Sequence, residues 1–273
     1  MTLTVLSTGN TLRSDAPFAV SPSVTAGLRT TLLGSSSSVA TVPRELGEIV
    51  LYTASSAELL ETLDASSSVE LTVKIFFPGK VTLENAQEAA QHALWLLVNA
   101  HSSPKASAPA PLVKSIIFSF GGLEFSDDDD DEETDFELSP EQVATVWTKA
   151  TTYAKTLGLG GAEFGVAEFS TSALQELVSR VGSETPRVAI DHINASDCCA
   201  LPKSLVQLSK TNNIKLLAHH DKPADHLVDP KELAEITSEL KLKSVDRWAW
   251  VLKLTALEKD RQLLVGNEYL VAV

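Results

Sequence analysis

The segment DHINASDCCALPKSLVQLSKTNNIKLLAHHD, residues 191–221, decides the fold class of this chain. Its first residues continue an apolar run that begins at Val188 and is typical of a buried strand. Pro202 then opens a stretch with apolar residues at helical spacing, and the apolar strand pattern resumes at Ile214. The segment therefore predicts a strand, a helix and a second strand in close succession, which is a βαβ unit.

The alternation of strands and helices continues outside this segment. Ser139 and Gln142 have the spacing of a capping box, with Pro140 at the first helical position, and so predict the start of a helix. Apolar patterns predict a further helix at residues 86–98 and strands at residues 71–77, 113–120 and 161–170. Because this alternation runs from about residue 69 to residue 241, we predict an α/β fold with a parallel sheet and right-handed crossovers.

The length and composition fit one large core. The chain has 273 residues, of which 44% are hydrophobic and 21% charged. Since α/β barrels of about 250 residues form one unit, we predict a single domain over residues 1–273. Stretches rich in Pro, Ala and Ser or in acidic residues predict surface loops at residues 102–111 and 126–138.

The net charge of the chain argues against some classes of binding partner. Its formal net charge of -14 repels phosphate backbones and anionic lipid, so we expect neither a nucleic acid nor a membrane as partner. Two cysteines make no disulfide framework, and MTLTVLSTGN resembles no secretion signal, so we expect a cytoplasmic protein. The helix predicted at residues 86–98 is too short and too polar to span a bilayer.

An acidic run occupies residues 127–133, between a predicted strand and the helix that starts near Ser139. Like charges repel one another, so a solvated loop is the favoured interpretation. Docking to a basic patch on a partner and weak calcium binding are the alternatives. Calcium loops need glycine and spaced oxygen ligands, which this run lacks.

Residues 164–178, FGVAEFSTSALQELV, resemble the fifth strand, turn and helix of the aldo-keto reductase superfamily. Residues 188–194 then take the place of that barrel's sixth strand, and residues 214–219 the place of its seventh. The resemblance implies an aldo-keto reductase-like (β/α)8 barrel of the TIM type, with departures from the regular barrel at both ends of the chain.

A sharper resemblance lies inside this one. Asn194-Ala195-Ser196, Cys198-Cys199, Leu201-Pro202 and residues 214–219, IKLLAH, resemble the family of regulatory (modifier) subunits of glutamate-cysteine ligase. The tail is similar to the same family at residues 248–252 and 266–273, and Thr8-Gly9-Asn10 echoes its start. The resemblance covers mainly residues 160–273.

Reductase chemistry in such a barrel needs a tyrosine acid, a lysine that lowers the pKa of that tyrosine, an aspartate and a histidine. Lys74 stands at the place of the lysine. The following strand ends with Ser119 and Phe120 where the family has histidine, and Tyr52 lacks the aspartate and glycine that should flank it. We therefore expect no hydride transfer, no cofactor and no retained NADPH binding.

Cys198 and Cys199 have three interpretations. Free cysteines are commonly buried as small apolar residues. The resemblance instead implies an accessible thiol at the barrel rim that forms a disulfide with a partner subunit. Adjacent cysteines also bond each other, in a strained and easily reduced ring. A pair without further Cys or His ligands gives too few groups for zinc.

Other polar and aromatic residues are candidates for the site or the interface. Consecutive strand side chains point to opposite faces, so His219, His220 and Asp221 do not share one ion, and packing or capping is the favoured interpretation. The alternative is that His219 and His192 line the barrel mouth. The candidates for the barrel mouth are Lys74, Ser119, His192, Asn194, His219 and His220. Trp248 and Trp250 are either core residues or interface anchors.

These observations favour a protein that regulates rather than catalyses. The resemblance implies a heterodimer with the catalytic subunit of glutamate-cysteine ligase, with better binding of glutamate and ATP and weaker feedback inhibition by glutathione. Two alternatives remain. One is an NADPH-dependent reductase in which Lys74 and Tyr52 converge, and the other is a barrel adaptor for a different protein.

Overall fold

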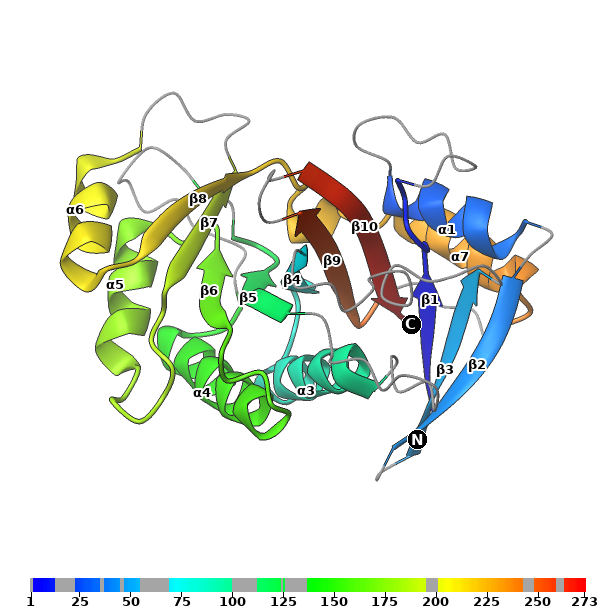
Figure 1. Ribbon diagram of the computed structural model, residues 1–273, viewed down its shortest axis with the longest axis horizontal. Helices are drawn as coiled ribbons and strands as arrows, with labels where there is room; N and C mark the ends of the chain where they lie inside the picture. The colour runs from blue at the N-terminus through cyan, green and yellow to red at the C-terminus, as the bar shows by residue number, and fades with distance from the viewer. Residues whose placement is uncertain are drawn as a thin grey trace. The chain divides into compact units, whose positions relative to one another are not determined.

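The computed structural model describes residues 2–12, 23–34, 37–44, 47–54, 69–99, 112–123, 125, 137–194, 201–242, 248–258 and 263–273. Contacts between Cα atoms divide the chain into two compact units that interleave along the sequence (Figure 1). Unit 1 comprises Met1–Val73, Trp95–Val113 and Leu227–Val273, and unit 2 comprises Lys74–Leu94 and Lys114–His226. The single domain over residues 1–273 stays a prediction.

Unit 2 contains the parallel part of the α/β fold. Its strands lie in the order β4-β5-β6-β7-β8, and the pairs β5/β6, β6/β7 and β7/β8 are parallel. Along the chain its elements are the greater part of α3 (Leu83–Asn99) and β5 (Leu112–Phe120), the end of β4 (Val69–Phe77) from Lys74, and the whole of α4 (Pro140–Thr156), β6 (Glu163–Ala167), α5 (Thr171–Arg180), β7 (Ile190–Asn194), α6 (Lys203–Asn212), β8 (Lys215–His219) and the short 3-10 helix η1 (Ala224–His226). The prediction of an α/β fold with a parallel sheet is confirmed, and residues 191–221 form the predicted βαβ unit.

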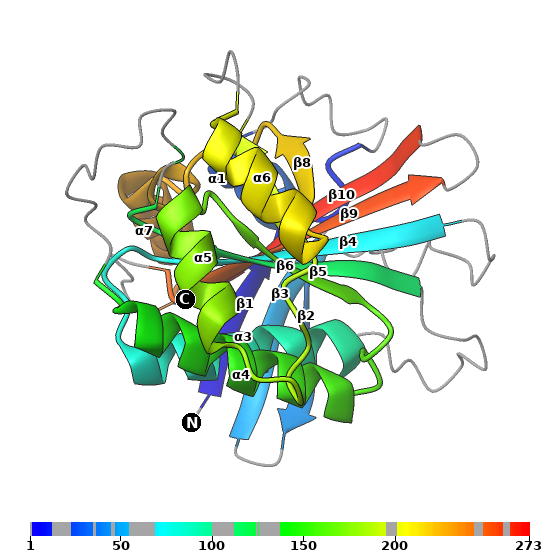
Figure 2. The same ribbon diagram turned by 90° about the vertical axis from the view of Figure 1, so that its left-hand side faces the viewer.

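Local sequence signals explain why these elements form. Ser139 accepts a hydrogen bond from the backbone N–H of Gln142, whose side chain accepts one from Ser139 N–H at 2.8 Å, so the predicted capping box is present. The apolar face of α4 is buried, and the Trp147 ring lies edge-on to Phe118 at 5.8 Å. Figure 2 shows α4, α5 and α6 in front of the parallel strands. This face of the sheet is therefore covered by helices, as a parallel sheet requires.

The predicted loops lie almost wholly outside the described residues, as does the acidic run at 127–133. The exception is the end of the second loop, where Leu138 is only 5% exposed. Leu138 precedes the cap residue Ser139, and this is the position from which an apolar side chain packs toward the first turns of a helix. The surface loops at residues 102–111 and 126–138 stay predictions.

Unit 1 contains mainly antiparallel strands. Its elements are β1 (Thr2–Ser7), α1 (Val24–Leu32), β2 (Ser37–Arg44), β3 (Gly47–Ala54), α7 (Pro230–Glu239), β9 (Trp250–Glu258) and β10 (Leu263–Ala272). The strand order is β2-β3-β1-β10-β9. β1 and β3 are parallel, whereas β2/β3, β1/β10 and β10/β9 are antiparallel. A regular (β/α)8 barrel has parallel strands throughout, so these pairs depart from it at both ends of the chain, and the (β/α)8 barrel itself stays a prediction.

The first and last segments of the chain meet within unit 1. Thr8 N–H donates to the Tyr269 carbonyl at 2.9 Å, and Tyr269 N–H donates to Thr8 Oγ1 at the same distance. Asn267 N–H donates to Asn10 Oδ1 at 3.2 Å. Trp248 and Trp250 are 5% and 1% exposed, and a role in the core accounts for that burial.

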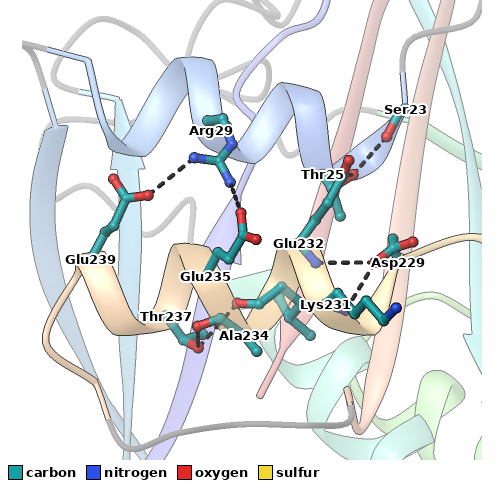
Figure 3. Close-up of polar contacts among 11 residues, drawn as sticks. Ser23, Thr25, Arg29, Asp229, Lys231, Glu232, Ala234, Glu235, Thr237 and Glu239 are labelled. Carbon is teal, nitrogen blue, oxygen red and sulfur yellow. Dashed lines mark hydrogen bonds and ion pairs between the residues drawn. The ribbon is translucent and has the colours of Figure 1, made fainter.

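Helices α1 and α7 of unit 1 are joined by polar contacts between their side chains (Figure 3). The Arg29 guanidinium donates to Glu235 at 2.8 Å and to Glu239 at 3.0 Å, and Thr25 Oγ1 donates to Glu232. Beneath these contacts the helices bury apolar side chains, among them Leu28 and Ile236. No helix in the described part of the chain is long and apolar enough to cross a bilayer.

Candidate functional site

A network of buried and half-buried polar groups crosses the parallel strands of unit 2, and Glu168, Asn194, His219 and Asp221 stand at or just beyond the carboxyl ends of these strands. Parallel strands present these ends at one edge of their sheet, where α/β folds place functional residues. The residues of this network are Lys74 on β4, Glu168 just after β6, Asp191, His192 and Asn194 on β7, His219 on β8, and Asp221 two residues beyond it. We call these seven residues the charge network. They include four of the six residues predicted to line the barrel mouth.

Lys74 is held inside the protein by other members of the network. Its side chain is 3% exposed, and its Nζ donates to Asp221 Oδ2 at 3.1 Å. The same nitrogen lies 3.3 Å from His219 Nε2 and 4.9 Å from the centre of the Phe76 ring. A buried ammonium is tolerated when it is paired and hydrogen-bonded, and Asp221 supplies that pairing.

His219 connects β8 to β6 and β7. Asp221 N–H donates to Nδ1 at 3.1 Å, so a neutral ring carries its proton on Nε2. Nε2 lies 2.6 Å from Glu168 Oε1 and 3.1 Å from the His192 carbonyl, and both oxygens accept from it. His219 Nε2 and Lys74 Nζ are then both hydrogen-bond donors, which is an unfavourable contact. The carboxylates of Glu168 and Asp221 accept from these two nitrogens and offset it.

Glu168 takes part in the network because of an unusual backbone conformation. Its φ is +65°, a left-handed value that costs a residue with a side chain about 1–3 kcal/mol and is enriched at functional sites. Its N–H donates to the His192 carbonyl at 3.1 Å, and its Oε2 accepts from Asn194 N–H at 3.3 Å. The strained residue thus places its carboxylate against the end of β7.

Asp191 is the most deeply buried acid of the network. It is 0% exposed, and neither carboxyl oxygen has a hydrogen-bond partner. Burial raises the pKa of Asp191 well above its usual range, and the charge of Glu168 raises it further. Nearby backbone amides at Phe169 and His192, and the charge of Lys74, oppose this rise, although neither amide reaches hydrogen-bonding geometry. The environment therefore favours the neutral carboxylic acid.

The other predicted site residues differ in their placement. Asn194 Nδ2 donates to the Asp221 carbonyl at 3.3 Å, and the His192 and His219 rings lie 4.5 Å apart. Ser119 is buried on β5, at 3% exposure, whereas His220 is exposed beyond the end of β8. Cys198 and Cys199 lie outside the described residues, so their accessibility and their pairing stay predictions.

Sequence reasoning did not find Glu168 or Asp191 as site residues. Asp191 is the second residue of the apolar strand β7, and an acid in such a run is the one available signal. The role of Glu168 depends on a positive φ, which no sequence pattern of a non-glycine residue reveals. Within the described part of the chain, no three His, Cys, Asp or Glu side chains are arranged to hold a metal ion.

A second polar cluster holds the loops at the same edge of unit 2. Asp225 in η1 accepts from the N–H of Gly79 at 2.8 Å and from the N–H of Gly122 at 2.6 Å. A Cβ added to Gly121 would lie 2.3 Å from the Gly79 nitrogen and 2.7 Å from the Asp225 carboxylate. The backbone approaches so closely here that only glycine fits.

Comparison with known proteins adds little to this description. No family model matches the chain, and no curated protein matches it. Among solved structures, a GH26 beta-mannanase from Bacteroides ovatus, BoMan26A, matches with 10% sequence identity and a TM-score of 0.27. The match covers 59% of this chain and 59% of the mannanase. A similarity of this size supports no conclusion about the fold or the activity of the chain.

Proposed function

We propose that this protein is a non-catalytic regulatory subunit of glutamate-cysteine ligase. It binds the catalytic subunit as a heterodimer, raises the affinity of that subunit for glutamate and ATP, and relieves feedback inhibition by glutathione. The observation that carries the proposal is the resemblance of residues 194–202 and 214–219 to the regulatory subunits of this ligase. The charge network supports the part of the proposal that says the protein itself does not catalyse a reaction.

Lys74 is engaged in a way that suits a structural role. In a reductase barrel, the corresponding lysine must lower the pKa of a nearby tyrosine. The ammonium of Lys74 is instead paired with Asp221 beside His219. The one tyrosine in the sequence of unit 2 is Tyr153, in the last turn of α4, and a crossover helix returns toward the amino ends of the strands. The pairing of Lys74 with Asp221 thus suits a structural role better than the activation of a phenol.

The residues that carry the resemblance belong to connected pieces of structure. In the described part of residues 194–219, Asn194 ends β7, residues 203–212 form α6 and residues 215–219 form β8. The resembling segments at the two chain ends meet through the hydrogen bonds between Thr8 and Tyr269. This clustering is what a shared structure with the regulatory subunits would produce. The aldo-keto reductase-like (β/α)8 barrel, incomplete or modified at the chain ends, belongs to the same proposal.

Regulation of this kind requires a difference in binding free energy. The protein must bind the active conformer of the catalytic subunit more tightly than the inactive one. A coupling free energy of about 1–3 kcal/mol would change the affinity for glutamate roughly 5- to 150-fold. A disulfide from Cys198 or Cys199 to the partner would increase the amount of complex when glutathione is scarce. If activation under oxidising conditions is unchanged in a Cys198→Ser/Cys199→Ser double variant, the redox part is wrong.

The test is γ-glutamylcysteine synthesis by the catalytic subunit of the same organism, with and without this protein, over a range of glutamate and glutathione concentrations. We expect a lower apparent glutamate requirement and weaker inhibition by glutathione. No change in either, together with no co-purification, would overturn the proposal. A fluorescence titration with NADPH then tests the reductase alternative, because binding of the cofactor would favour it.

A further inference from the structure

Strand β8 forms an open edge of the parallel strands in unit 2. It is the last strand in the order, and among the described strands it pairs with β7 alone. Lys215 N–H donates to the Ala189 carbonyl at 2.9 Å, and successive peptide groups face alternate sides of a strand. The N–H and C=O groups of Leu216 and Ala218 therefore face away from β7, where another strand can bind them.

This edge lacks the protection that exposed edge strands usually have. Natural edges carry free lysines, prolines or bulges that prevent pairing with another chain. The single lysine within β8, Lys215, lies 2.6 Å from Glu163 and is neutralised by it. The register with β7 is continuous, and Leu217 is 42% exposed. Leu201, just before α6, is 36% exposed, so the βαβ unit also carries apolar surface at its other end.

The charge around this edge is opposite to the charge of the chain. Residues 201–220 contain Lys203, Lys210 and Lys215 but no Asp or Glu, although the chain has a net charge of -14. Lys203 and Lys210 lie on α6, which contacts β8, and Lys222 follows the strand. All four lysines are exposed, and because Glu163 neutralises Lys215, the excess positive charge comes from Lys203, Lys210 and Lys222. The occupant that complements such a surface is acidic, and a second copy is disfavoured because it would bring two sets of lysines together.

We infer that the outer edge of β8, with the lysines of α6, is the docking surface for an acidic, extended segment of the catalytic subunit. The segment adds to β8 as a further strand, with backbone hydrogen bonds to Leu216 and Ala218. Its apolar side chains cover Leu217, and its carboxylates face the lysines. The inference rests on the proposed function, since it names the surface by which the regulatory subunit binds its partner.

Two sets of variants test the backbone and the charge separately. Ala218→Pro removes an outward N–H and leaves the ladder to β7 intact, because proline is tolerated at that position of an edge strand. Its control is Ala218→Ser, which keeps the N–H. Lys203→Glu/Lys210→Glu reverses two charges on α6, and Lys149→Glu/Lys155→Glu makes the same change in charge on the exposed side of α4. Circular dichroism and thermal unfolding establish that each full-length variant is folded.

The measurement is the Kd for the purified catalytic subunit by biolayer interferometry, at about 50 mM and about 300 mM NaCl. We expect Ala218→Pro and the α6 double variant each to weaken binding about tenfold or more, and both controls to bind like the wild type. The wild-type affinity should also fall as salt rises. If all variants bind equally, the docking surface is wrong and the proposed function stands.

A peptide probe covers the case in which the subunit does not bind. The probe is a fluorescent ten-residue peptide of alternating glutamate and isoleucine, followed by fluorescence polarisation. Binding to the wild type but not to Ala218→Pro would support the surface while the proposed function fails. If neither the subunit nor the peptide binds, the surface is overturned as well.

Discussion

At the level of single residues, Asp191 makes the stability of the fold depend on pH. Burial raises its pKa in the folded state, while an unfolded chain keeps a value near 3.8. As pH rises above about 4, the unfolded state ionises and the folded state keeps its proton, so the free energy of unfolding falls by up to about 1.4 kcal/mol per pH unit until the raised pKa is reached. Below the unfolded pKa both states are protonated, and this cost is absent.

Asp191→Asn should therefore flatten this pH dependence and raise the free energy of unfolding at neutral pH relative to the wild type. Urea unfolding at several pH values between about 4 and 8 measures both effects. Glu184→Gln, an exposed carboxylate in the same unit, should leave the dependence as it is. If the free energy of unfolding of Asp191→Asn falls with pH as steeply as that of the wild type, the burial of an uncompensated acid at this position is contradicted.

Gly121 is a residue that the close approach of three chain segments fixes as glycine. Gly121→Ala would place a Cβ against the Gly79 nitrogen and the Asp225 carboxylate, so we expect a loss of about 1–3 kcal/mol in the free energy of unfolding. Gly161→Ala is the matched control, because nothing lies within 4 Å of its added Cβ. Equal urea midpoints for the two variants would show that the loops move apart at little cost.

At the level of elements, the packing of α1 on α7 should depend on apolar burial rather than on the ion pairs of Arg29. The Arg29 side chain is 42% exposed and Glu235 is 66% exposed, and exposed pairs contribute about 1 kcal/mol at most. Arg29→Gln should thus lower the free energy of unfolding by less than about 1 kcal/mol, and added salt should shrink the difference. Ile236→Ala, at a fully buried position, should cost about 2–5 kcal/mol. Urea unfolding measures both losses, and a larger loss for Arg29→Gln than for Ile236→Ala would contradict the prediction.

Elements that depend on local patterns could be predicted, and elements that depend on distant pairing could not. The capping box at Ser139 and the apolar runs of β4, β5 and β7 are signals within a few residues, and each marks an element of the structure. The pairing of β1 with β10 joins opposite ends of the chain, so no local pattern indicates that it is antiparallel. The charge network shows the same limit. Side chains that follow one another along a strand point to opposite faces, so the pattern predicts that His219, His220 and Asp221 do not all face one site. The strand ends at His219, however, and beyond it the Asp221 side chain accepts a hydrogen bond from Lys74.

At the level of the whole molecule, the proposed regulation predicts a reciprocal effect that can be measured without following the reaction. If the protein raises the affinity of the catalytic subunit for glutamate by some factor, glutamate must tighten the complex between the two subunits by the same factor. We therefore expect saturating glutamate to lower the Kd between the subunits roughly 5- to 150-fold, with the factor equal to the change in glutamate affinity. Glutathione, which binds better to the lone catalytic subunit under this proposal, must weaken the complex. Titration calorimetry with each ligand present measures these changes, and glycine serves as a control that should leave the Kd unchanged. A lower glutamate requirement in the assay with no change in Kd would mean that the protein alters a rate and not a binding equilibrium, since reciprocity holds for binding free energies and not for kinetic constants.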